Sequence, residues 1–178
     1  VRLTGDCPFA DPALIDELVE AFHSGEWDYL ANCADEQQLT VPDGFDAEVF
    51  KACLLERAAL EARMPSEREH VTPWMRSAAA GLNWGHFRHK PLRPYYRVTV
   101  DDPIDLEVVQ QIAAALYPQD PEFGVDDVVA YLNANPQLAA KNLATIRNEG
   151  LLRSLAEDRA MQQSLGSANS GQGQELWQ

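Results

Sequence analysis

Two segments far apart in the chain share one design, an apolar strand that ends at an aspartate and is followed by a proline-initiated helix. Residues 1–8 read Val-Arg-Leu-Thr-Gly-Asp-Cys-Pro and end their strand at Asp6, whereas residues 96–103 read Tyr-Arg-Val-Thr-Val-Asp-Asp-Pro and end theirs at Asp101. Parallel strands collect their carboxyl ends along one sheet edge, so the two acids are expected to converge there. Carboxylate oxygens suit Mg²⁺, which in turn suits a nucleotide triphosphate. The alternative is that both aspartates only form turns and cap helices.

The two helices that follow have clear start signals. Asp11 and Pro12 supply an N-cap and a first-turn proline, and Asp102 and Pro103 repeat that pattern. Apolar residues then recur at helical spacing in both segments. They are Leu14, Ile15, Leu18, Val19 and Phe22 in the first helix, and Leu106, Val109, Ile112, Ala113 and Leu116 in the second. Strands and helices therefore alternate, which is typical of an α/β fold.

The region between the two aspartates has a mixed pattern. Residues 28–32 read as a short strand, residues 42–44 (Pro-Asp-Gly) as a turn, and residues 45–49 as a strand whose alternation places Asp46 and Glu48 on one face. Residues 51–63 read as a helix. Its predicted apolar side consists of Ala52, Leu55, Ala59 and Ala62. A solvated strand face is the alternative to a binding role for Asp46 and Glu48.

Residues 65–94 contain two further candidate features. Ser66 and Glu69 have the spacing of a helix capping box, and Pro73 breaks the short helix that they begin. Residues 86–94 form a basic cluster that suits an anionic sugar or phosphate, with a solvated loop as the alternative. His86 and His89 have helical metal spacing, but the nearby prolines and the lack of a third ligand argue against zinc.

The carboxyl-terminal third is expected to be mainly helical. Residues 125–132 are amphipathic, a helix restarts at residues 135–136, and residues 146–150 suggest a strand followed by a turn. Residues 151–163 are predicted to form a docking helix. Residues 164–178, rich in Ser, Gly and Gln, are predicted to be a disordered tail or linker.

The amino-acid composition limits the kinds of molecule that this protein is expected to bind. The formal net charge of −14 argues against a nucleic-acid polymer, because phosphate binding requires a concentrated cationic surface. No apolar run approaches the length of a membrane span, so no membrane partner is expected. The three cysteines form no C-x-x-C pair, which favours reduced thiols and a cytoplasmic location.

Four segments carry a resemblance to a known family: residues 1–12, 42–50, 65–73 and 97–107. Together they resemble the cytidylyltransferases of the spore coat polysaccharide biosynthesis protein F type, which are related to synthetases of CMP-activated sugar acids. The resemblance covers residues 1–150 and implies a nucleotide-diphospho-sugar transferase fold, a Rossmann-like three-layer sandwich. It implies transfer of CMP from CTP to a sugar or sugar-acid hydroxyl, with release of pyrophosphate, in surface polysaccharide or glycan biosynthesis.

The resemblance also implies roles for individual residues. Asp6 and Asp101 would be the catalytic residues that hold Mg²⁺. The substrate-binding candidates are Arg2, Thr4 and Arg97 on the strand faces of these acids, Asp46 and Glu48 facing the sugar pocket, and Glu69 and His70 in the Glu-Arg-Glu-His run at residues 67–70. For Arg97 an alternative is an ion pair with Asp101 that keeps the acid charged.

Three expectations concern the whole protein. Members of the family begin with a strand and a nucleotide-binding loop that find no match before Val1, so residues 1–150 are expected to be the carboxyl-terminal part of an amino-terminally truncated domain, inactive alone. A homodimer is expected through residues 43–93, supported by the apolar residues Trp74, Met75, Leu82, Trp84 and Phe87. The alternatives are a non-catalytic dimerisation or interaction module, and a sugar-nucleotide-dependent glycosyltransferase, although no D-x-D triplet ends a strand.

Overall fold

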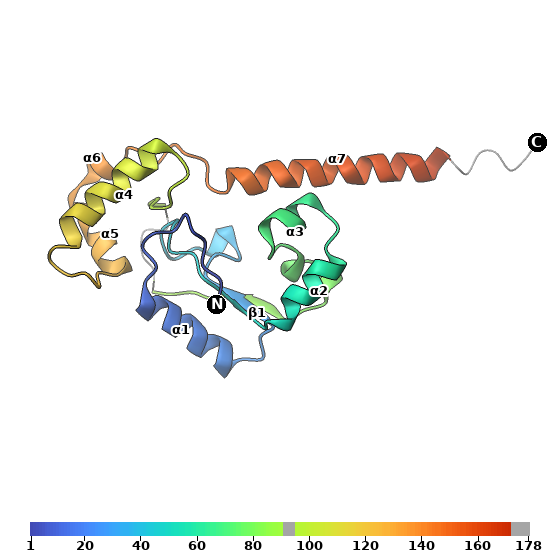
Figure 1. The fold of residues 1–178 in the computed structure, drawn as a ribbon, viewed down its shortest axis with the longest axis horizontal. Helices are drawn as coiled ribbons and strands as arrows, with labels where there is room; N and C mark the ends of the chain where they lie inside the picture. Colours follow the sequence, from blue (N-terminus) through green and yellow to red (C-terminus); the bar gives the residue numbers. More distant parts are fainter. Residues whose placement is uncertain (91–94, 172–178) are drawn as a thin grey trace, which may run out of the picture. The chain divides into compact units, whose positions relative to one another are not determined.

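The computed structural model describes residues 1–90 and 95–171, with side chains up to residue 164 (Figure 1). The chain divides into two compact units. The first consists of residues 1–51 and 82–145, and the second of residues 52–81 together with the chain from residue 146 onward. Both segments that carry the predicted aspartates belong to the first unit.

The first unit contains a three-stranded mixed sheet with the order β2-β1-β3. Strand β1 (Tyr29–Ala31) pairs antiparallel with β2 (Glu48–Phe50) and parallel with β3 (Trp84–His86). The prediction of a strand at residues 28–32 is confirmed. The strand predicted at residues 45–49 lies later in the chain, and β3 was not predicted. The architecture combines helices with a small sheet and is an α/β fold, as expected.

The two predicted aspartate strands are extended segments rather than full strands. Each makes a single β-bridge, Arg2 with Glu48 and Asp43 with Arg97. Pairing stops early because the chain turns: the Cys7 amide donates back to the Thr4 carbonyl at 3.2 Å. Beside Arg97, the partner chain bends away at once, because Gly44 adopts a φ of +108°. The prediction of two regular sheet strands is therefore wrong, although the first segment bridges Glu48 of β2.

Four helices complete the first unit: α1 (Pro12–Ser24), α4 (Pro103–Leu116), α5 (Val125–Ala134) and α6 (Pro136–Ala139). A short 3-10 helix, η1 (Glu36–Gln38), lies between β1 and β2. Leu18 of α1 packs with Leu30 and Val49 of the sheet, whereas α4, α5 and α6 share a second core with Val98. Helices α4, α5 and α6 lie together in Figure 1. Leu106, predicted to be apolar-facing, is instead 45% exposed.

Asp11 joins two helices of this unit, and its predicted capping role is confirmed. One carboxylate oxygen accepts from the amides of Ala13 and Leu14, at 2.8 and 3.1 Å. The other accepts from the amide of Val125, the first residue of α5, at 2.8 Å. A single buried carboxylate thus satisfies unpaired amides at the start of both α1 and α5.

The second unit is helical. It contains α2 (Cys53–Glu61), α3 (Pro65–His70), the 3-10 helices η2 (Trp74–Arg76) and η3 (Ala78–Ala80), and α7 (Glu149–Gly171). Helix α2 was predicted, but its buried residues are Leu54 and Ala58, whereas the predicted Leu55 is 44% exposed. Of the predicted apolar side, Ala62 is buried, directly after the end of the helix. Trp74 and Met75 are fully buried, contrary to the expectation that they form exposed apolar surface.

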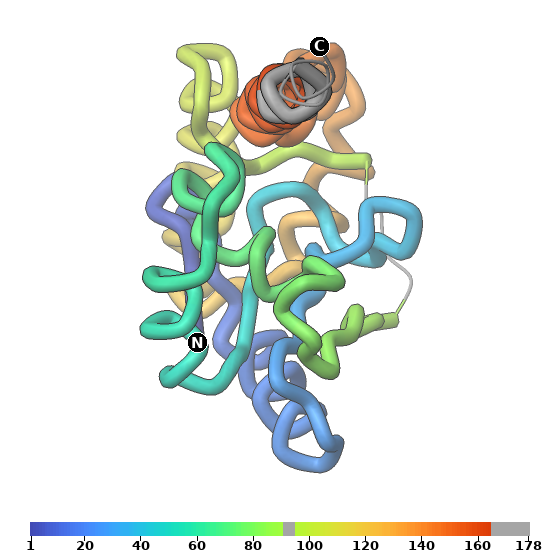
Figure 2. Tube along the Cα trace, turned by 90° about the vertical axis from the view of Figure 1, so that its right-hand side faces the viewer, coloured from blue at the N-terminus to red at the C-terminus, as the bar shows by residue number. Residues whose placement is uncertain are grey.

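Polar side chains join α3 to α7, which lie side by side in both views (Figures 1 and 2). The Ser66 amide and hydroxyl donate to the carboxylate of Asp158 at 3.0 and 2.6 Å. Ser66 is therefore not a cap; Glu67 instead accepts from the amides of Arg63 and Met64, which directly precede α3, at 2.8 and 3.0 Å. The Ser66 capping prediction is wrong because a residue far along the chain takes its hydroxyl.

The carboxyl-terminal predictions hold in part. Helices α5 and α6 occur where the sequence predicted them. Residues 146–148 form no strand, and α7 begins at Glu149. Helix α7 includes the predicted docking helix and continues to Gly171, past the predicted boundary at residue 163, whereas residues 172–178 lie outside the described residues. No helix within the described ranges has both the length and the apolar character needed to cross a membrane.

Candidate functional site

The segments that carry Asp6 and Asp101 lie directly against each other in the first unit. The amide of Val100 and the hydroxyl of Thr99 both donate to the main-chain carbonyl of Asp6, at 2.8 and 3.1 Å. Both acidic side chains are exposed, and that of Asp101 retains 56% of its accessible surface. The structure thus brings together two segments that are more than ninety residues apart in sequence, as expected.

The donor set at this place suits Mg²⁺ only when a ligand completes it. Among the described residues, no group of three or more His, Cys, Asp or Glu side chains is arranged to hold a metal. Mg²⁺ in nucleotide-dependent enzymes is commonly held by one or two carboxylates, with phosphate oxygens and waters filling the other positions. Asp6 and Asp101 could supply those carboxylates, and their metal role stays a prediction.

A buried arginine links Asp101 to the interior. Arg97 donates to both oxygens of Asp105, from Nε at 3.0 Å and Nη2 at 2.9 Å. Its Nη1 donates to Asp43 at 2.9 Å and its Nη2 also donates to Asp101 at 2.5 Å. One guanidinium therefore faces three carboxylates, of which Asp105 is fully buried. The alternative expected for Arg97, an ion pair with Asp101, is present.

Hydrogen bonds and neighbouring charges keep Arg97 and Asp105 charged. Burial disfavours the charge on Arg97, but hydrogen bonds to Asp105 and Asp101 outweigh that effect and raise its pKa. Burial likewise opposes the charge on Asp105. Hydrogen bonds from Arg97, Asn142 and the amides of Asp101 and Asp102 outweigh it and lower the pKa of Asp105 to about 2.

Sequence reasoning missed Asp43, Asp105 and Asn142. Asp105 could have been found, because it lies three residues after Asp102 at the start of α4, the spacing of a capping box. Its carboxylate accepts from the Asp102 amide at 3.1 Å. Asn142 carries no local signal, because its amide reaches Asp105 at 2.8 Å only through the tertiary fold.

Arg2 and Glu48, two predicted substrate-binding residues, are engaged with each other. Arg2 forms an ion pair with one oxygen of Glu48, and the hydroxyl of Tyr29 donates to the other oxygen at 2.6 Å. Glu48 is only 6% exposed. Both of its oxygens are thus occupied inside the protein. Asp46 is half-buried, and its role toward a sugar hydroxyl stays a prediction.

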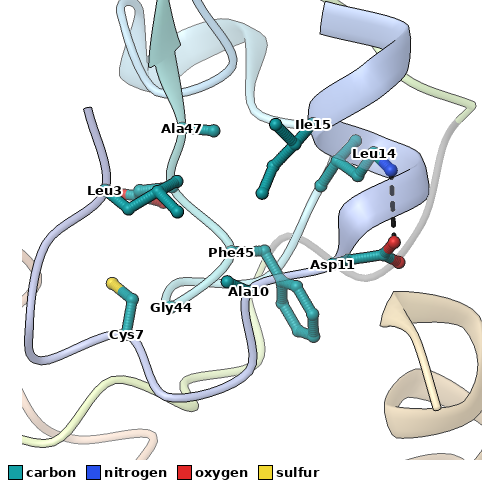
Figure 3. Close-up of a pocket in the computed structure, with 10 residues that line it drawn as sticks. Leu3, Cys7, Ala10, Asp11, Leu14, Ile15, Gly44, Phe45 and Ala47 are labelled. Atoms are coloured by element: carbon teal, nitrogen blue, oxygen red, sulfur yellow. Dashed lines mark hydrogen bonds between the residues drawn. The ribbon is translucent and has the colours of Figure 1, made fainter. Parts of the chain in front are cut away.

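A small pocket lies beside Asp46 (Figure 3). Its lining is mostly apolar and comes from the amino-terminal loop, α1 and the chain before β2. The lining residues are Leu3, Cys7, Ala10, Asp11, Leu14, Ile15, Gly44, Phe45, Asp46 and Ala47. About 240 Å³ of empty space lies between these residues, open solvent included, so the pocket is too small to enclose a sugar nucleotide.

The Cys7 thiol in this pocket has a raised pKa. Thr4 Oγ1 lies 3.1 Å from its sulfur, so the predicted site residue Thr4 contacts Cys7. Burial raises the pKa of Cys7 to about 11; the negative charges of Asp46 and Asp6 act in the same direction, and the Thr4 hydrogen bond opposes them. The thiol therefore stays protonated at neutral pH.

Glu69 and His70 lie in the second unit, where they contact α7. The Ser154 hydroxyl lies 2.5 Å from a Glu69 oxygen and 3.2 Å from His70 Nε2. Ser154 is only 2% exposed. The structure thus gives both residues a partner in α7, and their predicted role toward substrate stays a prediction.

In the described part of the basic cluster, His86 and His89 both contact other residues of the first unit. His86 Nδ1 accepts from the Asp35 amide at 3.1 Å, and its Nε2 donates to the Gln38 carbonyl at 3.0 Å. Burial lowers the pKa of His86, although the bond to Gln38 opposes this shift. His89 contacts Glu17 at 2.7 Å. Residues 91–94 of the cluster lie outside the described residues.

Comparison with known proteins identifies relatives over most of the chain. No family model matches. The chain is 33% identical over 151 residues to the spore coat polysaccharide biosynthesis protein SpsF of Bacillus subtilis (strain 168), a match that covers 81% of this chain and 58% of SpsF. It is 36% identical over 75 residues to the uncharacterized protein MJ1063 of Methanocaldococcus jannaschii, which covers 42% of this chain and 28% of that protein.

A solved structure supports the same relationship. A cytidylyltransferase from Leptospira borgpetersenii serovar Hardjo-bovis (strain JB197) superimposes with a TM-score of 0.68 at 29% identity, covering 78% of this chain and 57% of that protein. The chain thus spans somewhat more than half the length of both relatives. Sequence and structural similarity agree, and the chain is homologous to SpsF-type cytidylyltransferases over somewhat more than half of their length.

Proposed function

We propose that the whole protein transfers CMP from CTP to a hydroxyl of a sugar or sugar acid, releasing pyrophosphate, in the synthesis of a surface polysaccharide or glycan. The supporting observation is the contact between the Asp6 and Asp101 segments within a fold that a cytidylyltransferase shares. Two exposed carboxylates at adjoining chain segments suit a metal-bound triphosphate. Because CTP is a metabolite of the cytoplasm, the same proposal places the protein there.

In the proposed reaction, the sugar hydroxyl oxygen forms a bond to the α-phosphorus of CTP, and the bond between the α-phosphorus and the bridging oxygen of pyrophosphate breaks. The hydroxyl proton passes to solvent. Asp6 and Asp101 would hold Mg²⁺, and the ion would supply positive charge for the phosphates and the leaving pyrophosphate. Arg97 orients Asp101, and Asp46 binds a hydroxyl of the sugar.

The test is pyrophosphate release by the whole protein, residues 1–178 with any further sequence that its gene encodes. CTP, Mg²⁺ and a panel of sugars and sugar acids are supplied, and the other nucleoside triphosphates serve as comparison. We expect release with CTP only, and its loss in Asp6→Asn and Asp101→Asn at unchanged melting temperature. Glu122→Gln, an exposed acid elsewhere in the first unit, is the matched control. Normal release by either aspartate variant would contradict the metal assignment.

For residues 1–178 alone we expect no CTP turnover and weak Mg-CTP binding. The chain matches only 58% of SpsF. Phosphate groups are commonly bound by main-chain amides at loops and at the starts of helices. The part of SpsF that this chain does not match can supply such amides. Calorimetric titration with Mg-CTP tests this. Saturable binding tighter than about 10 μM, roughly 7 kcal/mol, would show that these residues hold the complete nucleotide site.

We further propose a homodimer formed through residues 43–93. Trp84 is 40% exposed on β3, which supports an interface, whereas the burial of Trp74 and Met75 removes part of the apolar surface expected there. Sedimentation velocity at micromolar concentration, with Trp84→Ser as the variant, tests this proposal. A wild-type monomer would contradict it.

A further inference from the structure

We propose that Asp105 is a positioning residue: it contacts no substrate, and it fixes Asp101 in the orientation in which Asp101 binds the metal. The inference rests on the proposed function. It concerns a residue that is fully buried in the first unit and that the metal site does not itself include.

Five donors converge on the carboxylate of Asp105. One oxygen accepts from Arg97 Nε at 3.0 Å and from the Asn142 amide at 2.8 Å. The other accepts from Arg97 Nη2 at 2.9 Å and from the main-chain amides of Asp101 and Asp102, both at 3.1 Å. A carboxylate has about four lone-pair sites, so this group is saturated and its position is fixed.

Asp105 restrains Asp101 in two independent ways. It holds the main-chain amide of Asp101 directly, and it holds Arg97, whose Nη2 donates to the Asp101 carboxylate at 2.5 Å. Arg97 cannot follow Asp101 toward solvent, because Asp43 binds its other nitrogen at 2.9 Å. The exposed acid is thus attached to a rigid, buried arrangement, as the ligands of well-formed metal sites are.

Replacement of Asp105 by asparagine keeps its shape and removes this restraint. Every group that faces Asp105 is a donor, so an amide NH₂ meets a donor in either orientation. In one orientation it opposes Arg97 Nε and Asn142; in the other it opposes Arg97 Nη2 and the amides of Asp101 and Asp102. Arg97 and the chain at Asp101 then lose their fixed positions.

The experiment measures binding of Mn²⁺ and CTP to the 178-residue chain by water-proton relaxation enhancement. The variants are Asp105→Asn, Asp101→Asn and the control Asp158→Asn, with the folded fraction of each followed by circular dichroism. Asp158 is also a buried acid, but it belongs to the second unit, where it accepts from the amide and the hydroxyl of Ser66. We expect Asp105→Asn, while folded, to weaken binding about tenfold or more, and Asp158→Asn to leave affinity within twofold while lowering stability.

The outcomes distinguish an error in the positioning role of Asp105 from an error in the proposed metal site. If Asp101→Asn weakens binding and folded Asp105→Asn does not, the positioning role is wrong and the metal site stands. If Asp101→Asn has no effect, the metal site itself is wrong, and the positioning role with it. Should Asp105→Asn not fold, Asn142→Ala removes one donor to Asp105 and is expected to weaken binding two- to fivefold; unchanged affinity in that variant would overturn the positioning role.

Discussion

Gly44 is the position where one added methyl group should most disturb the site. Its φ of +108° is unfavourable for any other residue, and a Cβ built there lies 2.6 Å from both the carbonyl carbon of Val98 and the amide nitrogen of Thr99. These are main-chain atoms of the segment that carries Arg97 and Asp101, so the conflict cannot be relieved by rotating a side chain. Gly44→Ala must therefore strain one chain or move the other.

The expected destabilisation combines two contributions. A non-glycine residue in so rare a conformation costs about 1–3 kcal/mol. Overpacking against a fixed neighbour costs about 1–3 kcal/mol more. We expect Gly44→Ala to lower the free energy of unfolding of the first unit by about 2–6 kcal/mol, a large share of the roughly 5–15 kcal/mol typical of a domain.

Native-state hydrogen exchange measures this within the first unit. The reporter is the amide of Val98, which donates to the Asp43 carbonyl at 2.7 Å. Gly5→Ala is the control, because a Cβ at Gly5 meets no atom within 4 Å and its φ lies outside the strained range. We expect less than about 0.5 kcal/mol from that control. A loss below about 1 kcal/mol in Gly44→Ala would refute the reasoning.

Two further predictions follow from the polar contacts. The pKa of Asp105 is about 2 in the folded protein, against an ordinary value of 3.8. The charged Asp105 therefore stabilises the folded state fully above about pH 4, and this contribution of about 2 kcal/mol is lost as the pH falls toward 2. In urea unfolding, the stability difference between wild type and Asp105→Asn should therefore shrink over that range, and a constant difference would contradict the shift. In the second unit, Asp158→Asn should weaken its bonds to Ser66 and speed hydrogen exchange along α7, with a cost of about 1–3 kcal/mol. Exposed Glu157→Gln is its control, and equal exchange in the two variants would show that Asp158 does not anchor α7.

The sequence predicted local structure best where the stabilising partner is also local. Asp11 caps α1 through amides two and three residues away, and the Pro-Asp-Gly turn needs only the positive φ of Gly44. Strand β1 and helix α5 likewise follow from their own residue patterns. The second bond of Asp11, to α5, depends on the tertiary fold and leaves no local trace.

Predictions failed where a distant residue took the partner. Ser66 looks like a cap, but Asp158 binds its hydroxyl across 92 positions of sequence. Glu48 alternates like a surface residue, but Tyr29 and Arg2 bury it. These tertiary contacts override local spacing.

The candidate site was predicted in outline. Asp6 and Asp101 were placed near each other by strand-end reasoning, and their segments do adjoin, although neither forms a regular strand. The buried support beneath Asp101 was not predicted, since Asp43 and Asp105 are 54 and 8 positions from the Arg97 that binds them. Only the folded chain shows that one arginine joins these acids.

The most direct test of the metal site is paramagnetic line broadening in the amide NMR spectrum of the 178-residue chain, with Mn²⁺ and CTP as the probe. The method detects weak binding, which is the affinity expected for this chain. We predict selective loss of the amide signals of residues 4–7 and 99–102, and its reversal in both Asp6→Asn and Asp101→Asn. Broadening centred on other residues, or broadening at these residues that persists in both variants, would contradict the assignment of the site.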